Sequence, residues 1–411
     1  MKILVVGGGS GGHITPAVAV VREILEKRPR TKIEFWTDKK YYKNVVKITT
    51  EIGVHWGDED KLGSKKNPYI KVQKISAGKF HRYSGLTLEN YFAEGAKTLR
   101  DITFGNLFGF FGFLGGLFQS FFRLFPKKKR PDVIFLKGGY VGLPVGIVAK
   151  WLKIPYVIHE SDAVAGLANR VLMKRAQVVA MGMPFDKGIA GRESWTWVGI
   201  PIASEYKKIS NTTQKQLKRS AGFDPEKPLV IVTGGSQGAE HINLAMREIL
   251  PEMLKFSSVG LIAGRKHYED MIDLKKYEEW DKAKLQSNFR LWNFSPTMQE
   301  LLGAADVVVS RAGATTIAEL AVLSKPVVLV PYEKLPGDHQ SRNAERLEKL
   351  GAVMVVPDSK MVEKPEELLE AVKMLVRSPK KREELALKLH EEAKIDAAER
   401  LADILLEVGA N

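Results

Sequence analysis

The sequence contains no cysteine, so neither a disulfide nor a thiolate metal site can be part of its structure. It lacks an N-terminal apolar stretch with a small-residue cleavage site, because MKILVVGGG leads directly into a strand pattern. Its His, Asp and Glu residues form no cluster with metal-ligand spacing. We therefore expect a cytoplasmic protein that uses neither a metal nor a cofactor.

Acidic residues are too few to balance the basic ones: 48 Asp and Glu against 63 Lys and Arg leave a net charge of +15. Such a charge favours an anionic partner, whether nucleic acid, anionic lipid or a phosphorylated ligand. No helix-turn-helix, zinc finger or RNA-binding aromatic motif is recognisable, so we expect no nucleic acid partner. The 411 residues, 44% hydrophobic and 27% charged, suffice for two globular domains of about 150–200 residues each.

The two halves of the chain repeat one pattern. Residues 2–13 read KILVVGGGSGGH and residues 229–239 read LVIVTGGSQGA, each an apolar run that ends in a glycine-rich turn before a helical pattern. DVIFLKGGY at 132–140 corresponds in the same way to DVVVSRAGA at 306–314. Apolar strands that alternate with helices predict parallel sheets with every glycine-rich turn at the carboxyl edge. We therefore expect an α/β protein of two Rossmann-like domains facing across a cleft.

Composition suggests where the domains end. VGIPIASEY at 198–206 precedes a polar stretch, so we expect a first domain at 1–199 and a second at 200–380. The charged run 381–411 is helical in pattern and is expected to form a C-terminal helix. Packing of this helix on the first domain is one arrangement that the sequence allows.

The glycine-rich turns are typical of anion sites, because backbone N–H groups at a helix N-terminus can approach a phosphate there. In the first turn, Thr15 and Pro16 are expected as the N-cap and first-turn residues of the helix. One such turn could equally serve only the strand–helix geometry, but two at equivalent positions favour anion binding. Neither turn continues into the Gly-Lys-Ser/Thr of a P-loop, and GGGSGG is an imperfect dinucleotide motif that does not require hydride transfer.

Five motifs make the pattern specific. GGGSGGHITPAVAV, HESDAVAGLANRVL, VTGGSQGAEHIN, SRAGATTIAEL and DHQSRNAERLEKLGA resemble, in order and spacing, the MurG family of peptidoglycan N-acetylglucosaminyltransferases. The resemblance implies a GT-B fold and an inverting, metal-independent transfer, with the donor in the C-terminal domain and the acceptor in the N-terminal domain. It implies UDP-N-acetylglucosamine as the donor and undecaprenyl-pyrophosphoryl-N-acetylmuramoyl-pentapeptide (lipid I) as the acceptor, whose muramoyl 4-hydroxyl attacks to give lipid II.

The resemblance also implies two sets of site residues. His13 is the candidate catalytic base, with binding of the acceptor diphosphate as its alternative task. The acceptor-binding set comprises Gly9, Ser10, Gly11, Gly12, His13, Gly138, Gly139 and Tyr140. The donor-binding set comprises Ser10, Gly11, Gly12, Asp162, Gly235, Ser236, Gln237, Gly238, Phe294, Ser295, Arg311, Gly313, Ala314, Thr315, Thr316, Glu319, His339 and Gln340.

Some of these residues have a plain structural explanation as well. Glu319 is expected to bind the ribose hydroxyls, but its spacing from Thr316 also matches a capping box of its own helix. Arg311 is equally compatible with a phosphate contact and with a solvent-exposed side chain. For Phe294 we prefer a place in the core over one beside the uracil.

Two positions depart from the family pattern. Asp162 stands where many members carry Asn, and Ala203 stands where some carry Arg near the donor phosphate. Neither departure breaks the overall pattern. A related UDP-sugar transferase acting on another lipid, such as diacylglycerol, would share the fold and the donor-site chemistry and stays open as an alternative, although GGGSGGH with HESDAVAGLAN favours the muramoyl lipid. The net charge alone would also fit a non-catalytic nucleotide- or nucleic-acid-binding protein, which would not need both donor and acceptor motifs.

Residues 104–125 form an apolar segment, FGNLFGFFGFLGGLFQSFFRLF, in which 13 of 22 residues are Phe or Leu. Its length would allow a membrane-spanning helix, but it lies between strands of one predicted domain, is rich in glycine and carries Arg123. A core helix would need fewer large apolar residues. We expect instead a monotopic helix or helical hairpin in the cytoplasmic leaflet of the cell membrane, with the basic residues 127–130 on anionic headgroups. The protein would then be peripheral to that membrane.

Overall fold

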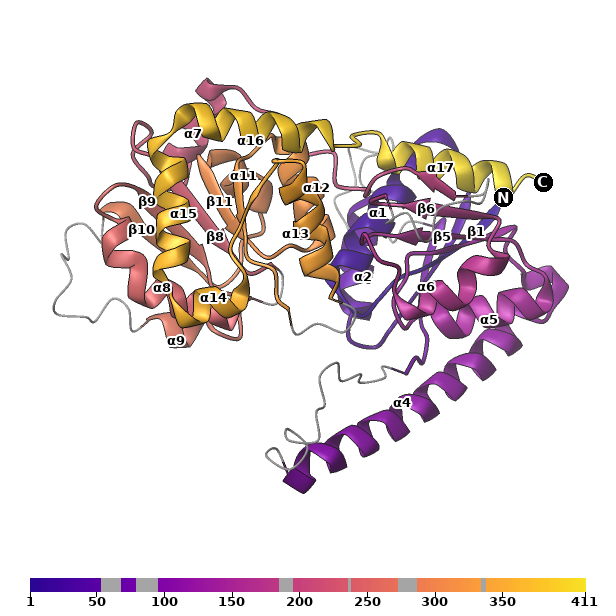
Figure 1. The fold of residues 1–411 in the computed structure, drawn as a ribbon. Helices are drawn as coiled ribbons and strands as arrows, with labels where there is room; N and C mark the ends of the chain where they lie inside the picture. Colours follow the sequence, from indigo (N-terminus) through magenta and orange to yellow (C-terminus); the bar gives the residue numbers. More distant parts are fainter. Residues whose placement is uncertain (53–67, 79–94, 185–194, 236–237, 273–286, 334–337) are drawn as a thin grey trace. The chain divides into compact units, whose positions relative to one another are not determined.

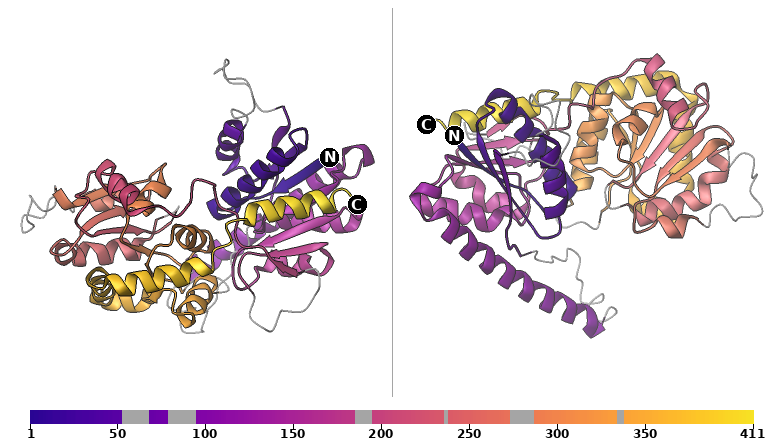
Figure 2. Two further views of the ribbon diagram at one scale, coloured as in Figure 1. Left: turned by 90° about the horizontal axis from the view of Figure 1, so that it is seen from above. Right: turned by 180° about the vertical axis from the view of Figure 1, so that it is seen from behind.

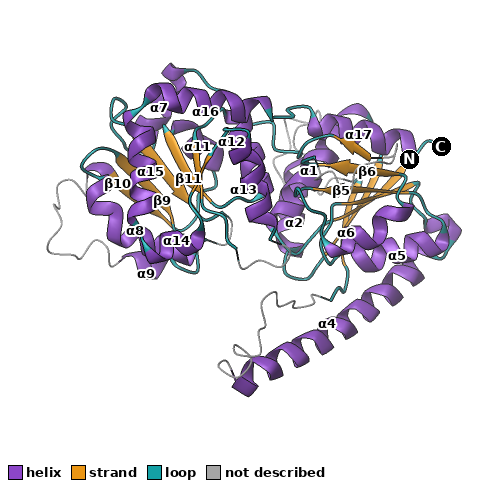
Figure 3. Ribbon diagram, viewed as in Figure 1, coloured by secondary structure: helices purple, strands orange, loops and turns teal. Residues whose placement is uncertain are grey.

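The structure is a computed structural model that describes residues 1–52, 68–78, 95–184, 195–235, 238–272, 287–333 and 338–411 (Figure 1). The chain forms two compact units, one of Met1–Ala203 with Ile395–Asn411 and one of Ser204–Lys394. The first unit leaves off at Ala203, where the sequence suggested 199, and the second ends at Lys394, where the sequence suggested 380. Each unit has a parallel sheet with helices on both faces, so the predicted α/β class is confirmed (Figure 3).

The sheet of the first unit has the strand order β3-β2-β1-β4-β5-β6-β7, and its neighbouring strands all pair in parallel. Strands β4 and β5 are buried along their whole length, which is why they read as continuous apolar runs. The strands are β1 (Lys2–Val6), β2 (Lys32–Thr37), β3 (Ile70–Lys74), β4 (Val133–Leu136), β5 (Tyr156–Glu160), β6 (Val178–Met181) and β7 (Trp195–Trp197).

Helices complete a hydrophobic core on each face of this sheet. One core contains side chains of α1, α2 and α17, and the other contains side chains of α4, α5 and α6. Two short 3-10 segments, η2 and η3, follow α4 and α6. The bounds are α1 (Gly11–Lys27), α2 (Tyr42–Glu51), α4 (Gly95–Leu124), η2 (Lys127–Lys129), α5 (Gly142–Leu152), α6 (Leu167–Leu172), η3 (Met173–Arg175) and α17 (Ala397–Val408).

The first helix begins earlier than the sequence suggested. α1 starts at Gly11 with Ser10 at its N-cap, so the expectation that Thr15 and Pro16 mark its start is wrong. The turn between β1 and α1 needs a positive φ only at Gly9, so the two glycines that follow Ser10 are free to adopt helical conformation. The end of the glycine-rich segment is therefore itself the first helical turn, and its backbone amides lie at the carboxyl edge of the sheet.

The second unit contains a parallel sheet with the order β10-β9-β8-β11-β12-β13. Its strands are β8 (Leu229–Thr233), β9 (Ser258–Ile262), β10 (Phe289–Trp292), β11 (Val307–Ser310), β12 (Val327–Leu329) and β13 (Met354–Val355). Its helices are α7 (Asn211–Ser220), α8 (Glu240–Met253), α9 (Tyr268–Ile272), α11 (Met298–Ala304), α12 (Ala314–Leu323), α13 (His339–Lys349), α14 (Asp358–Glu363), α15 (Glu366–Arg377) and α16 (Pro379–Glu391).

The C-terminal segment forms two helices rather than the single helix expected for 381–411. α16 belongs to the second unit, where it packs on α12 and α15. α17 belongs to the first unit and packs on α1, with Leu401 fully buried (Figure 2). Lys27 of α1 forms ion pairs with Asp403 at 2.6 Å and Glu399 at 3.1 Å across this contact.

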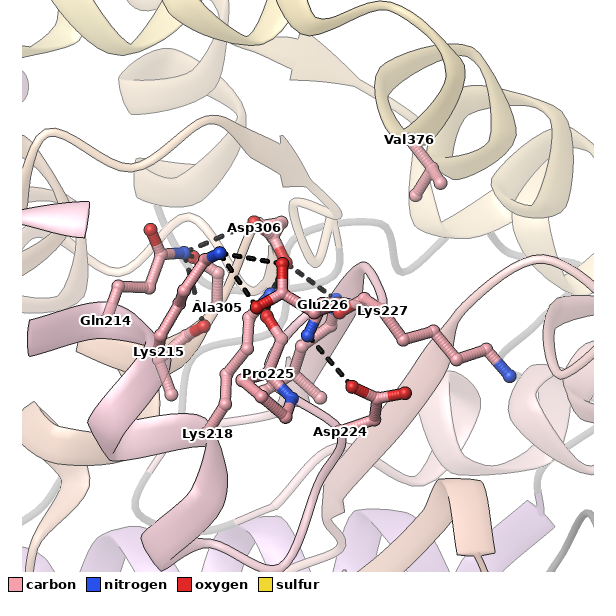
Figure 4. Close-up of polar contacts among 12 residues, drawn as sticks. Gln214, Lys215, Lys218, Asp224, Pro225, Glu226, Lys227, Ala305, Asp306 and Val376 are labelled. Atoms are coloured by element: carbon pink, nitrogen blue, oxygen red, sulfur yellow. Dashed lines mark hydrogen bonds and ion pairs between the residues drawn. The ribbon is translucent and has the colours of Figure 1, made fainter. Parts of the chain in front are cut away.

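The carboxylate of Asp306 lies at the amino end of the second sheet, where it binds groups from neighbouring elements (Figure 4). Asp306, directly before β11, accepts a hydrogen bond from the backbone N–H of Leu229 at 2.7 Å. Its carboxylate also forms an ion pair with Lys218 Nζ at 2.6 Å. Gln214 of α7 donates to the carbonyl oxygen of Ala305 at 2.8 Å. These contacts hold α7 at the end of the sheet opposite the glycine-rich turns. We therefore assign the cluster a structural role.

α4 is one continuous helix of 30 residues, so the hairpin expected as an alternative is wrong for residues 95–124. One side packs in the first unit: Ser120 is buried, and a Cβ on Gly116 would lie 2.2 Å from the carbonyl oxygen of Ser76. In the described part of the chain, α4 is the helix that is long and apolar enough to span a membrane, over Gly105–Leu124, with 22% of the apolar window buried. Large apolar side chains are exposed along it: Leu107, Phe108, Phe110, Phe111, Phe118 and Phe122.

Candidate functional site

The first glycine-rich turn is held by an aspartate at the end of β2. Asp38 Oδ2 accepts hydrogen bonds from the Gly9 backbone N–H at 2.7 Å and from the Tyr140 hydroxyl at 2.9 Å. Gly9 has a φ of +81°, and a Cβ there would lie 2.7 Å from Tyr140 Cε1, so only glycine fits. Asp38 thus joins the GGGSGGH and GGY turns, both of which supply residues to the predicted acceptor site. Sequence reasoning missed Asp38, although a polar residue directly after the strand KIEFWT was a signal.

The ring of His13 is fixed by the same turn. Its Nδ1 lies 2.8 Å from the Gly8 carbonyl oxygen and 3.2 Å from Ser10 Oγ. A carbonyl oxygen can only accept, so Nδ1 carries the proton and the neutral ring has its lone pair on Nε2. Gly139, with a φ of +76°, leaves room for the ring, because a Cβ there would lie 2.9 Å from His13 Cε1. Burial, and then the charge of Lys137, lower the pKa of His13 and favour this neutral form.

The HESDAVAGLAN loop is organised around the buried carboxylate of Glu160. Glu160 accepts hydrogen bonds from Gly166 N–H at 2.8 Å, Asn169 Nδ2 at 2.8 Å and Asp162 N–H at 3.2 Å. A Cβ on Gly138 would lie 3.0 Å from the same Asn169 amide nitrogen, so this glycine permits the loop to approach β4. The structure therefore brings Asp162 and the GGY turn to the same edge of the first sheet.

The second glycine-rich turn follows β8 at the carboxyl edge of the other sheet. Gly235 and Gly238 have φ values of +75° and +77°. Among the described residues, no atom lies within 4 Å of a Cβ built on Gly235, whereas one on Gly238 would meet the Ala263 carbonyl oxygen at 2.5 Å. Gly238 is thus needed for packing, and no described residue fills the space beside Gly235. Ser236 and Gln237, both predicted donor ligands, lie outside the described residues.

The N-terminus of α12 offers a third open turn. Gly313 is its N-cap with extended backbone, and among the described residues no side chain caps the helix and no atom lies within 4 Å of a Cβ built there. Ala314, Thr315 and Thr316 form the first turn of the helix, whose amides are the unsatisfied donors that suit an anion. Because the helix begins before Thr316, the capping-box explanation of Glu319 is wrong.

Glu319 lies inside α12 with its carboxylate in a largely enclosed environment. It accepts a hydrogen bond from the Tyr206 hydroxyl, a residue that sequence reasoning missed. Burial raises the pKa of Glu319 to about 7, and the Tyr206 hydrogen bond opposes part of that rise. A carboxylate held in this way can accept hydrogen bonds from two vicinal hydroxyls.

Arg311 is buried, so the exposed alternative is wrong. Its guanidinium pairs with Asp358 Oδ1 at 2.5 Å, donates to the Val330 carbonyl oxygen at 3.1 Å and lies 5.2 Å from the centre of the Tyr332 ring. Asp358 also accepts from His241 Nδ1 at 2.6 Å. In this structure the positive charge of Arg311 is therefore compensated within the second unit.

The remaining predicted donor residues lie at the start of α13 and in the loop after β10. Gln340 Oε1 accepts from the Tyr332 backbone N–H at 3.0 Å, and His339 is the first residue of α13. Phe294 is 48% exposed and lies 4.7 Å from the Arg265 guanidinium, so the core placement preferred from sequence is wrong. Ser295 Oγ accepts from the Thr297 N–H at 3.3 Å. No group of three or more His, Asp or Glu side chains that could hold a metal occurs in the described residues.

Comparison with known proteins places the chain in a family. The N-terminal domain model of glycosyltransferase family 28 matches residues 3–181, and the C-terminal domain model matches residues 229–401. A protein of Bacillus pumilus (strain SAFR-032) is 33% identical over 410 residues, 99% of each chain, and one of Thermoanaerobacter sp. (strain X514) is 30% identical over 409 residues, 99% of this chain and 100% of the relative. The chain belongs to the MurG family within glycosyltransferase family 28.

Both relatives of this MurG-family chain bear the name UDP-N-acetylglucosamine–N-acetylmuramyl-(pentapeptide) pyrophosphoryl-undecaprenol N-acetylglucosamine transferase. Its fold matches that of Acinetobacter baumannii MurG with a TM-score of 0.68 at 22% identity, covering 99% of both chains. A calicheamicin glycosyltransferase matches with a TM-score of 0.64 at 14% identity, covering 100% of this chain and 98% of that one. The GT-B architecture expected for a MurG-family glycosyltransferase is confirmed.

Proposed function

We propose that this enzyme transfers N-acetylglucosamine from UDP-N-acetylglucosamine to the muramoyl 4-hydroxyl of lipid I, which gives lipid II for peptidoglycan synthesis. The observation that carries the proposal is the end-to-end similarity to relatives that bear the name of this transferase. The fold alone would not choose the substrates, since one fold serves many sugar transferases. The geometry of His13 and of the open glycine-rich turns supports the same reaction.

On the donor side, the proposal assigns the diphosphate to backbone amides. The turn at Gly235 and the N-terminus of α12 at Gly313 lie at the carboxyl edge of the second sheet, and no atom of the described residues lies within 4 Å of a Cβ built on either glycine. Their N–H groups and helix dipoles can stabilise the negative charge that develops on the leaving UDP. Glu319 would accept from the ribose hydroxyls, with Gln340 and His339 assigned to the sugar and Phe294 to the uracil.

On the acceptor side, His13 would take the proton of the attacking hydroxyl. A bond forms between the muramoyl 4-oxygen and C1 of N-acetylglucosamine while the bond from C1 to the UDP oxygen breaks, so the configuration at C1 inverts. The proton passes to Nε2, the nitrogen that the Gly8 hydrogen bond leaves as the acceptor. The amides of Gly11 and Gly12 at the start of α1 would bind the acceptor diphosphate.

The membrane contact is assigned to α4. Phe111, Phe118 and Phe122 are between 60% and 69% exposed, more than a soluble surface helix usually shows. The exposed lysines 127–129 follow the helix after two residues and would contribute about 1 kcal/mol each on anionic lipid headgroups. Arg130 differs from them, because it donates to the carbonyl oxygens of Leu124, Phe125 and Leu152. The proposal is thus a peripheral enzyme on the cytoplasmic face of the cell membrane, in which the three exposed lysines, rather than all four basic residues 127–130, contact the headgroups.

The reaction can be tested directly with radiolabelled UDP-N-acetylglucosamine and UDP-galactose, each offered with lipid I and with diacylglycerol. We expect label to enter the muramoyl lipid from UDP-N-acetylglucosamine alone, without added divalent metal. Transfer to diacylglycerol would instead identify the alternative lipid glycosyltransferase. Absence of transfer to either lipid would overturn the proposal.

A further inference from the structure

A buried lysine, Lys137, stands two residues before Gly139, the glycine that packs against the His13 ring. Lys137 directly follows β4, and its backbone N–H donates to the Val6 carbonyl oxygen at 3.0 Å, so its backbone extends the sheet. The residue is 1% exposed, and its Nζ donates to Ser161 Oγ at 2.6 Å. Lysine is almost never fully buried without a partner for its charge. Its enclosure at the proposed acceptor site therefore needs an explanation.

Carboxylates near Lys137 explain why the amine can stay charged. Glu160 and Asp162 act on it through their charges, and both raise its pKa. Burial acts in the opposite direction and is the larger effect, so the pKa of Lys137 is lowered to about 8. At pH 7 the amine is still mostly protonated. The hydrogen bond to Ser161 orients this ammonium at the carboxyl edge of the first sheet.

His13 is enclosed by groups that also carry charge. Lys137 at the end of β4 and Glu160 at the end of β5 act on its ring with opposite signs, and Lys137 has the larger effect. Burial, then the charge of Lys137 and last the charge of His13 lower the pKa of His159 of β5 well below the usual value, and its Nε2 lies 2.8 Å from the Gly199 carbonyl oxygen. Asp38 and Tyr140, the other ionisable groups of the turn, are hydrogen-bonded to each other.

We propose that Lys137 is a positioning residue of the transfer reaction, whose buried ammonium keeps the His13 ring neutral with the Nε2 lone pair available to the acceptor hydroxyl. The inference rests on the proposed function for the role of His13. When two ionisable groups lie close together in an enclosed site, a positive charge on both is unfavourable in free energy. Because the amine holds its proton more tightly than the imidazole, the lysine stays charged and the histidine stays neutral. Lys137 would then act through His13 and would not touch the reacting atoms.

The activity test compares Lys137→Gln with a matched variant. The amide of Gln can still donate to Ser161 Oγ but carries no charge, so the acidic limb of the kcat/KM profile should move to higher pH. We expect the ratio of kcat/KM at about pH 6 to that at about pH 8 to fall severalfold. Lys150→Gln removes a charge from an exposed position of α5 and should leave the profile unchanged. Lys137→Arg, if it folds, should restore the profile.

Two outcomes of this test would overturn the inference. An unshifted acidic limb in a folded Lys137→Gln variant would mean that the ammonium does not act on His13. Loss of turnover by the same large factor at every pH would mean that Lys137 contacts the substrate itself. In either case transfer by the intact enzyme still reports separately on the proposed function.

A second measurement needs neither a Lys137 variant nor the reaction. The Cε1–H signal of His13 in the intact chain can be followed by NMR with labelled histidine and assigned by its loss in His13→Gln. If Lys137 acts on the ring, this signal should show its main inflection below pH 6.5 and a second, smaller one near pH 8, where the amine loses its proton. A single inflection at or above the usual histidine value would overturn the inference even if Lys137→Gln failed to fold.

Discussion

Asp306 accepts a hydrogen bond from the backbone amide of Leu229 at 2.7 Å, and this contact joins β11 to the first residue of β8. The first unit contains the same relationship. Asp132, directly before β4, accepts a hydrogen bond through Oδ2 from the backbone N–H of Lys2, the first residue of β1, at 2.7 Å. The internal repeat thus extends to single hydrogen bonds. The two sites differ in their surroundings, because Lys218 is buried beside Asp306 while Asp132 is exposed.

That difference predicts unequal effects on stability. Asp306→Asn leaves the Lys218 ammonium buried without its counter-charge, so the free energy of unfolding should fall by about 3 kcal/mol. Asp132→Asn removes only the charge of an exposed acceptor and should cost about 1 kcal/mol or less. Urea unfolding of the two variants and the parent chain measures both values. Equal losses would show that the Lys218 ion pair contributes nothing beyond the shared backbone hydrogen bond.

His13 is predicted to act in the chemical step. His13→Ala should lower kcat by about 10²–10⁴-fold at saturating acceptor, because positioned proton transfer contributes about that much. Binding of UDP, measured by calorimetry, should be nearly unchanged, since the contacts proposed above for the diphosphate, ribose and uracil of the donor all come from the second unit. A variant that keeps its kcat and instead shows a raised acceptor KM would identify His13 as a diphosphate ligand rather than a base.

Donor binding is predicted to depend on pH through Glu319. Its pKa of about 7 means that the carboxyl group is largely protonated below that value, and a protonated carboxyl loses one of the acceptors that two ribose hydroxyls need. The Kd for UDP should therefore rise as pH falls from about 8 to 6, by up to about tenfold per pH unit once below 7. Glu319→Gln should bind UDP more weakly and without this pH dependence.

The hydrogen bond from Tyr206 provides a control for that prediction. Because this bond lowers the pKa of Glu319, Tyr206→Phe should move the same change in UDP affinity to higher pH. Calorimetric titration with UDP across the pH range measures both variants. A pH dependence that persists in Glu319→Gln would assign it to another group.

The exposed side of α4 is predicted to hold the enzyme on membranes. Replacement of Phe111, Phe118 and Phe122 by Ser should release the chain from anionic liposomes in a flotation assay and should leave UDP binding intact. Met374→Ser, which removes an apolar side chain that is 55% exposed on α15, is the matched control and should float like the parent. Undiminished flotation of the triple variant would rule out this side of α4 as the contact.

Substitution is a sharper test than removal of residues 104–125. α4 also buries Ser120 and Leu124 and packs Gly116 against the segment at Ser76, so a deletion would disturb the core of the first unit. The exposed phenylalanines can be changed without that damage.

The architecture could be predicted from sequence because it depends on local patterns. Strands such as VIFL and LVIVT are continuous apolar runs, and the glycine-rich turns after β1 and β8 mark the sheet edges without any knowledge of tertiary contacts. His13 and Glu319 could be singled out because they stand in recognisable motifs. Helix starts were less predictable: the glycines after Ser10 look like loop residues but are helical.

The partners of the site residues could not be predicted, because they come from distant parts of the chain. Asp38 and Tyr140 are 102 residues apart in sequence, and Arg311 and Asp358 are 47 apart. Neither pairing has a periodicity or a spacing that a single sequence reveals. Burial of the Lys137 amine and exposure of the Phe294 ring likewise follow from tertiary packing, which overrides what each residue type prefers on average.

The return of the chain from α16 to α17 has a consequence for how the protein is made. Domains generally fold as units during synthesis, with the N-terminal one first, at about 5–20 residues per second. Here strands β1 to β7 are translated well before Leu401 and its neighbours, which cover α1. Translation of the roughly 200 residues between β7 and Leu401 takes about 10–40 s, and during this time α17 is not yet there to cover the apolar surface of α1. The first unit can therefore complete its core around α1 only after the second unit has been translated.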